Sequence, residues 1–157
     1  MVNIRIATSI AADITRCFDL SRSIDLHLKS GLQAEEAIAG VTTGLIGAGE
    51  QLTWRAKVFG IRVKHTTVIS DFQPPRYFQD KMVSGVFHHY CHDHYFSDQN
   101  GATQMVDIVE LSAPLGFLGW AVEQVWLRQY MTDLIERRAR HIKQVAESQV
   151  WRRYLRA

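Results

Sequence analysis

The chain has 157 residues, of which 46% are hydrophobic and 22% are charged, and its formal net charge is +2. This composition is that of a globular protein and argues against disorder, and the length suits one domain with a substantial core. The small net charge gives no reason to expect a nucleic-acid partner. No run of about 18 apolar residues offers a membrane-spanning segment.

The two cysteines, Cys17 and Cys91, do not make a recognisable disulfide framework, and the N-terminus carries no secretory signal. We therefore expect two reduced thiols in a cytoplasmic protein.

The first third of the chain predicts a strand followed by short helical segments. Val2–Ile10 alternates apolar and polar residues, which is typical of a half-buried strand. Asp13 suits the N-cap of a short helix that ends near Leu20. Ile24–Lys29 is predicted to be irregular or a second helical turn, and Glu35–Gly44 favours no single structure.

The middle of the chain predicts antiparallel strands. Glu50–Phe59 and Ile61–Ile69 both alternate, with Gly60 at the turn between them. This phase places Trp54 and His65 on the inner face. Pro74-Pro75 marks a loop, because proline fits neither a helix interior nor a central strand, and Tyr77–Met82 is predicted to be the next strand.

A predicted hairpin within Gly85–Leu111 carries the most informative residues. The polar turn Ser97–Gly101 separates two alternating runs. The inner face of the first run carries Tyr90, His92, His94 and Phe96, and that of the second carries Thr103, Met105, Asp107, Val109 and Leu111. If Phe96 pairs with Thr103, His94 lies opposite Met105 and His92 lies opposite Asp107.

The period changes from two to about 3.6 after Pro114, which predicts one long helix from Pro114 to Glu147 with Leu118 and Val122 on its apolar stripe. Strands, short helices and a final long helix make an α+β pattern. A single amphipathic helix does not fill a large concave sheet, so we expect a cavity between them, with a polar spot on an apolar wall.

The sequence resembles the START-like, or SRPBCC, superfamily of helix-grip proteins, which includes polyketide cyclases, lipid-transfer START domains and coenzyme Q-binding proteins; within it, the chain looks like an uncharacterised bacterial branch. The residues that carry the likeness are Gly49–Trp54, Phe59-Gly60, Pro75, Phe78–Asp80, Gly85–Phe87, His92–Phe96, Gly101–Thr103, Asp107 and Pro114–Gly116. The chain departs from the pattern of this branch at Val86 and Tyr90. The resemblance implies an α+β helix-grip fold, with a curved antiparallel sheet wrapped around the C-terminal helix and a cavity for an apolar small molecule.

Three interpretations remain open for His92, His94 and Asp107. Two histidines two residues apart on a strand can converge on one metal ion, with Asp107 as a third ligand. Because this spacing is common by chance, we favour a hydrogen-bonded His92–Asp107 pair in a buried wall, and we expect no metal and no cofactor. The third interpretation is acid–base catalysis, in which Asp107 fixes the tautomer of His92.

The leading functional prediction is binding or carriage of a small hydrophobic molecule, such as a lipid, a quinone or a polyketide-like compound. One alternative is a cyclase or dehydratase that uses His92 and Asp107, and another is a protein-interaction module with a collapsed cavity. The residues expected to contact the ligand are Trp54, His65, Tyr90, His92, His94, Met105, Asp107, Leu118 and Val122.

Residues 1–147 are expected to form the ligand-binding domain, followed by a basic C-terminal tail, 148–157. Eight Arg/Lys and three acidic residues follow from Arg128 onward. In the tail, Trp151 and Tyr154 lie among arginines and suit transient contact with a membrane surface or a partner, although a frayed tail or a clamp on the domain's own surface is the simpler interpretation. The pattern predicts no oligomeric state.

Overall fold

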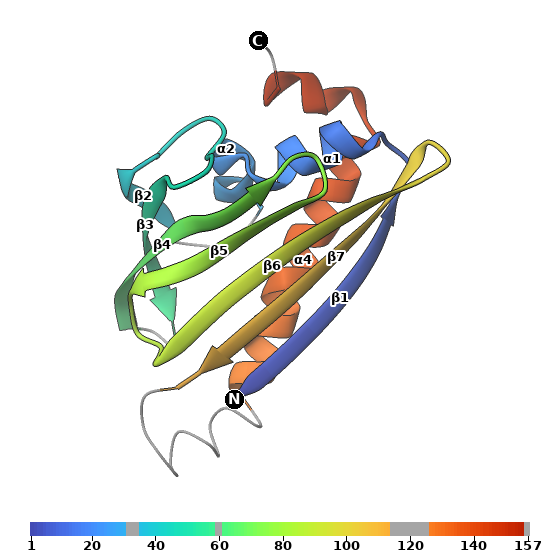
Figure 1. Ribbon diagram of the computed structural model, residues 1–157. Helices are drawn as coiled ribbons and strands as arrows, with labels where there is room; N and C mark the ends of the chain where they lie inside the picture. The colour runs from blue at the N-terminus through green and yellow to red at the C-terminus, as the bar shows by residue number, and fades with distance from the viewer. Residues whose placement is uncertain (31–34, 59–60, 114–125, 156–157) are drawn as a thin grey trace.

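The computed structural model describes residues 1–30, 35–58, 61–113 and 126–155. They form a curved antiparallel sheet of seven strands in the order β1-β7-β6-β5-β4-β3-β2, with helix α4 along one face (Figure 1). The strands are β1 (Val2–Ile10), β2 (Glu36–Gly40), β3 (Gln51–Val58), β4 (Ile61–Gln73), β5 (Tyr77–Ser84), β6 (His89–Gln99) and β7 (Ala102–Ser112). The helices are α1 (Ile14–Ser21), α2 (Ile24–Leu28), α4 (Arg128–Ala146) and the 3-10 helix η2 (Gln149–Arg153). The predicted α+β helix-grip fold is confirmed.

The N-terminal elements follow from local sequence signals. β1 has the predicted bounds, and its alternation buries Val2, Ile4 and Ile10. Asp13 caps α1, because its Oδ1 accepts a hydrogen bond from the Arg16 amide at 3.0 Å. Ser23 caps α2 in the same way, by accepting from the Leu26 amide at 3.3 Å. The segment Ile24–Lys29, predicted to be either irregular or a second helical turn, thus contains a short helix.

Strand β2 is an element that the sequence pattern did not assign. It pairs with β3 through a register shift between Ala37 and Ala39. Its five residues are too few, and its only large apolar side chain is Ile38, so the strand has no clear apolar–polar alternation; it is held by backbone pairing with β3 and by the Glu36–Arg55 ion pair. Such pairing leaves little trace in the sequence.

The predicted register of the β6–β7 hairpin is wrong by two residues. The turn is Asn100-Gly101 alone, with φ of 58° and 93°, rather than the five-residue turn that was expected. Positive φ at both positions suits a two-residue hairpin turn. His94 therefore lies opposite Asp107, and Met105 lies opposite Phe96. A shift of two keeps every side chain on its predicted face.

The long helix is described from α4 onward, and both polar and apolar contacts hold it to the sheet. Arg128 Nη1 donates to the Asn3 carbonyl at 3.1 Å, and Ile135, which is 1% exposed, packs in a cluster with residues of β1 and β7. The predicted part before Trp126, including Leu118 and Val122, lies outside the described residues. Over the described part of the chain, we find no helix both long and apolar enough to cross a membrane.

A second core cluster forms where α1 meets the sheet. Phe18 is 1% exposed, and its ring centroid lies 5.5 Å from those of Phe72, Phe78 and Phe96. The C-terminal segment packs on the same cluster through residues that include Trp151, whose ring lies 4.3 Å from the Arg16 guanidinium carbon. The end of the chain, as far as residue 155, thus lies against the domain's own surface.

We predict that Gly101→Ala destabilises the protein by about 1 kcal/mol, because alanine at positive φ is strained. No neighbouring atom lies within 4 Å of a Cβ added at this position, so the cost is one of backbone conformation alone. Urea unfolding measures it. Gly47→Ala is the control, since Gly47 does not have a positive φ. Equal stabilities of the two variants would contradict the prediction.

Candidate functional site

A cavity of about 130 Å³ lies between the inner face of the sheet, helices α1 and α2, and α4. Its wall is mostly aliphatic and aromatic, with a few polar groups from β4, β5, β6 and α4. Apolar lining residues include Ile24, Leu52, Trp54, Phe78, Tyr90 and Met131. Polar lining residues include His27, Glu35, His65, Asp80, His92, His94 and Arg138. This composition is that of a small-molecule site.

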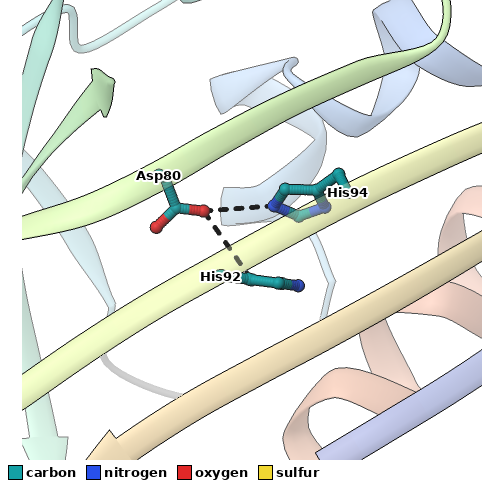
Figure 2. A group of neighbouring side chains, drawn as sticks. All are labelled: Asp80, His92 and His94. Atoms are coloured by element: carbon teal, nitrogen blue, oxygen red, sulfur yellow. Dashed lines mark hydrogen bonds and ion pairs between the residues drawn. The ribbon is translucent and has the colours of Figure 1, made fainter. Parts of the chain in front are cut away.

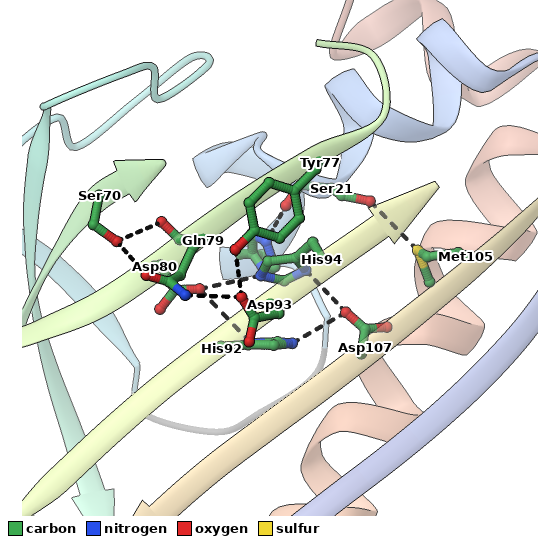
Figure 3. Close-up of polar contacts among 11 residues, drawn as sticks. Ser21, Ser70, Tyr77, Gln79, Asp80, His92, Asp93, His94, Met105 and Asp107 are labelled. Carbon is green, nitrogen blue, oxygen red and sulfur yellow. Dashed lines mark hydrogen bonds and ion pairs between the residues drawn. The ribbon is translucent and has the colours of Figure 1, made fainter. Parts of the chain in front are cut away.

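Four ionisable groups from three adjacent strands form a closed ring beside the cavity, and three of them, Asp80, His92 and His94, line it (Figure 3). Asp107 Oδ1 lies 3.1 Å from His92 Nε2 and 2.8 Å from His94 Nδ1. The other nitrogens face Asp80: His94 Nε2 lies 3.1 Å from Asp80 Oδ2, and His92 Nδ1 lies 3.7 Å from the same oxygen. Each imidazole is thus placed between the same two carboxylates.

Alternation and register together explain this convergence. His92 and His94 are two residues apart on β6, so both point to the inner face, with ring centroids 3.7 Å apart. Asp107 is the cross-strand partner of His94 on β7, and Asp80 is the partner of His92 on β5. The two carboxylates therefore approach the imidazoles from opposite sides.

The two imidazoles differ in protonation. Burial alone would lower the pKa of His94, but its hydrogen bonds to Asp107 and Asp80 outweigh burial and raise the pKa to about 9. Burial, together with the neighbouring charge on His94, lowers the pKa of His92 despite its hydrogen bond to Asp107. At neutral pH, one imidazole of the pair is charged and the other is neutral.

The two carboxylates stay ionised. Burial would raise the pKa of Asp107, but hydrogen bonds from His92 and His94 lower it below the usual value. Burial opposes ionisation of Asp80 as well, but the hydrogen bond from His94 and electrostatic attraction to the two imidazoles lower its pKa. Asp107 is 5% exposed, whereas the side chain of Asp80 is 19% exposed and lines the cavity.

His65 is a cavity residue with unused hydrogen-bonding capacity. Both of its ring nitrogens are buried, and neither has a hydrogen-bond partner among the described residues. Its ring meets Tyr90 edge-on at a centroid distance of 4.9 Å. The ring fits because residue 85 is glycine: a Cβ at Gly85 would lie only 2.5 Å from His65 Nδ1 and would clash with it. Burial lowers the pKa of His65, so the ring is neutral.

A buried ion pair lies at the α4 side of the cavity. Arg138 Nη2 lies 2.7 Å from Glu35 Oε2, and both side chains are less than a fifth exposed. Arg138 Nε is buried and has no partner among the described residues. This arginine interrupts the apolar stripe of α4 between Leu134 and Ile142, which are both buried. The pair brings a charged group to the cavity wall.

The structure brings five of the sequence-predicted contacts to the cavity: Trp54, His65, Tyr90, His92 and His94. Two others do not line it, which corrects the expectation. Met105 is 0% exposed and lies in the core, where its sulfur is 3.5 Å from Ser21 Oγ. Asp107 is absent from the cavity wall because its carboxylate binds the imidazole nitrogens that face away from Asp80.

Sequence reasoning missed Asp80, His27, Glu35 and Arg138. The signals for two of them were weak but present. Asp80 lies two residues after Phe78 on the predicted strand, so the two share a face. Arg138 lies at helical spacing within an apolar stripe. His27 and Glu35 carry no such pattern, because a short helix and an irregular segment place them beside the cavity.

We predict that His27 makes the protein less stable as the pH is lowered. His27 Nε2–H donates to the Ser21 carbonyl at 2.7 Å; burial, followed by the charge on Arg138, lowers the pKa of the ring from 6.5 to about 3. The unfolded chain therefore binds a proton that the folded chain does not, and stability decreases as the pH falls from 6.5 towards 3.

In His27→Gln, an amide replaces the titrating ring, so the loss of stability from pH 6.5 to about pH 5 should shrink by an amount on the order of 1 kcal/mol. Urea unfolding at several pH values measures this slope. His88→Gln, at an exposed histidine, is the control and should keep the wild-type slope. An unchanged slope in His27→Gln would contradict the assignment.

No protein-family model and no curated protein matches the sequence. Solved structures do match. Protein TTHA0849 from Thermus thermophilus has a TM-score of 0.69 at 15% identity, over 94% of this chain and 100% of that one. A START superfamily protein from Mycobacterium smegmatis has a TM-score of 0.69 at 10% identity, over 92% and 97%.

A plant protein matches equally well over its length. Ginseng major latex-like protein 151 from Panax ginseng has a TM-score of 0.66 at 13% identity, over 94% of this chain and 98% of that one. Identities this low establish similarity of fold, and the coverage shows that the similarity extends over nearly the whole of each chain. The chain therefore has the helix-grip fold of START-like and major latex-like proteins.

Proposed function

We propose that this protein binds or carries a small hydrophobic molecule in the cavity between the sheet and α4. The observation that supports this proposal is the cavity itself, which is about 130 Å³ and is walled mainly by apolar and aromatic side chains. A cavity with such a lining excludes water from an apolar guest and gains free energy from burying its surface. The START superfamily name of one structural neighbour is consistent with this proposal.

The cavity volume limits the size of the bound molecule. An engineered apolar cavity of roughly 150 Å³ holds one benzene ring, whereas sites for drug-sized ligands span roughly 300–1,000 Å³. A volume of about 130 Å³ suits a single ring. A longer lipid, quinone or polyketide-like molecule would place only its head group inside.

The polar groups favour a guest with a hydroxyl or carbonyl group. The neutral ring of His65 has one donor and one acceptor nitrogen, and both lack a partner among the described residues. A guest that supplies the missing hydrogen bond satisfies a buried polar group whose isolation is costly. We therefore infer an apolar ring with at least one oxygen function.

The other two interpretations have less support. A cavity of this size argues against a protein-interaction module with a collapsed interior. Acid–base catalysis by His92 and Asp107 is weakened because Asp107 does not line the cavity, and both nitrogens of each histidine already face a carboxylate.

Filling the cavity should abolish binding. Ala56 lines the cavity from β3, so in Ala56→Phe the added ring would occupy the space of the guest. We expect the affinity for p-cresol, used as a single-ring probe, to fall at least tenfold, as measured by isothermal titration calorimetry. Lys57→Phe adds the same ring at the next, exposed position and should leave the affinity unchanged. If Ala56→Phe binds p-cresol as the wild type does, the cavity is not the binding site.

His65 should provide the preference for an oxygen function. We expect the wild type to bind p-cresol about fivefold more tightly than toluene, since one hydrogen bond contributes about 1 kcal/mol. His65→Phe keeps a ring but removes both nitrogens, so the preference should disappear while toluene still binds. Thermal shifts with both probes measure the difference. A preference that persists in His65→Phe would assign the selectivity to another residue.

A further inference from the structure

We propose that Asp80, His92 and His94 bind a divalent transition-metal ion on the cavity wall. Each of these residues offers one ligand atom, and the three atoms all lie within 4.8 Å of one another (Figure 2). The residues come from two adjacent central strands, β5 and β6, whose register fixes their relative positions. Asp107 has a separate role, as the carboxylate that orients both imidazoles.

The separations between these atoms suit a shared ion. Two atoms that each lie about 2.1 Å from a tetrahedral Zn²⁺ are roughly 3.4 Å apart. The distances from Asp80 Oδ2 to His94 Nε2, 3.1 Å, and to His92 Nδ1, 3.7 Å, lie on either side of that value. All three atoms lie within 4.8 Å of one another, and small rotations of the side chains adjust the remaining separation between the two nitrogens.

Asp107 contacts only the nitrogens that would not bind the ion. Its Oδ1 contacts His92 Nε2 at 3.1 Å and His94 Nδ1 at 2.8 Å, and these are the nitrogens that face away from Asp80. His94 Nε2 donates to Asp80 Oδ2 at 3.1 Å, so an ion bound at this nitrogen would replace that proton, while His92 Nε2 and His94 Nδ1 keep their contacts with Asp107. Metal-binding histidines in proteins almost always have such an outer carboxylate or carbonyl partner.

Charge and burial also favour a cation. His92, His94 and Asp107 are all less than 7% exposed, and the group contains two carboxylates. A divalent ion that displaces the proton of His94 Nε2 would balance both of them. Arg138 lines the same cavity but pairs with Glu35 at 2.7 Å, so it does not supply this charge.

The set of donors indicates the class of ion. Two imidazoles and one carboxylate suit zinc, iron, cobalt or nickel rather than magnesium or calcium, which prefer oxygen ligands. Three protein ligands leave a fourth position open, as in catalytic zinc sites. Because all three residues line the cavity, an oxygen atom of a bound molecule would occupy that position.

The direct test is to titrate the chelator-treated protein with Zn²⁺ alone and to measure binding by isothermal titration calorimetry. We expect one Zn²⁺ per chain, no comparable binding of Mg²⁺, and a rise in melting temperature with Zn²⁺. Asp80→Asn and His92→Gln should weaken binding at least 100-fold, and Asp107→Asn should weaken it 10–100-fold, the usual loss when an outer partner is removed.

Two controls separate this site from surface binding and from misfolding. His88→Gln removes an exposed histidine, and His141→Gln removes a half-buried histidine of α4 outside the cluster; both should bind Zn²⁺ like the wild type. Near-ultraviolet circular dichroism establishes that each variant is folded, and Asp80→Asn provides the mildest change if His92→Gln does not fold. Co²⁺ provides a second readout, since its visible spectrum reports nitrogen coordination.

Two outcomes would overturn the proposal: folded wild-type protein that takes up no stoichiometric Zn²⁺, or Zn²⁺ affinity that is unchanged in Asp80→Asn. Either result would leave the four groups as a hydrogen-bonded network that satisfies only itself. The test uses no organic ligand, so its result is independent of whether p-cresol binds in the cavity.

Discussion

The site depends on the register of β6 against β7, which brings Asp107 to His94. The two-residue turn at Asn100-Gly101 sets that register, and a shift of two in either direction would keep the same faces but change every partner. Asp107 would then lie opposite His92 or Phe96, and would lose its place directly across from His94. Without Asp107, one nitrogen of each buried histidine would lose its carboxylate, at a cost comparable to a broken buried hydrogen bond.

The sequence predicted the faces of the strands better than their partners. Alternation depends only on local order, so the inner positions of β6 and β7 were predicted with His92, His94, Met105 and Asp107 all buried. The partners depend on where the chain turns. The whole polar run Ser97–Gly101 was predicted to be the turn, because Ser97, Asp98 and Gln99 can either extend a strand or form a loop. In the structure they extend β6, and only Asn100-Gly101 forms the turn.

The residues of the candidate site that the sequence missed come from elements far apart in the chain. Asp80 meets His92 only through pairing of β5 with β6. Arg138 and Glu35, 103 positions apart, meet only when the fold brings α4 beside the segment that precedes β2. Neither contact has a local pattern, because long-range pairing of charges is set by the three-dimensional fold. For His65, the sequence predicted which face of the strand carries the side chain, but it did not predict that both ring nitrogens lack a partner among the described residues.

The placement of the buried charges supports a functional interpretation over a purely structural one. Buried ion pairs seldom stabilise a protein more than apolar residues of the same size would, because desolvation offsets the attraction. In this chain, the fully buried side chains around Phe18 and between α4 and β1 include many apolar residues, as expected for regions that provide stability. Asp80, His92 and His94 of the ring instead border the cavity from the sheet, and the Arg138–Glu35 pair borders it beside α4. Selection for stability alone would fill this space with aliphatic side chains. A hollow that has charged groups on two walls and aromatic rings between them is better explained by the requirements of a bound molecule, one end of which is polar.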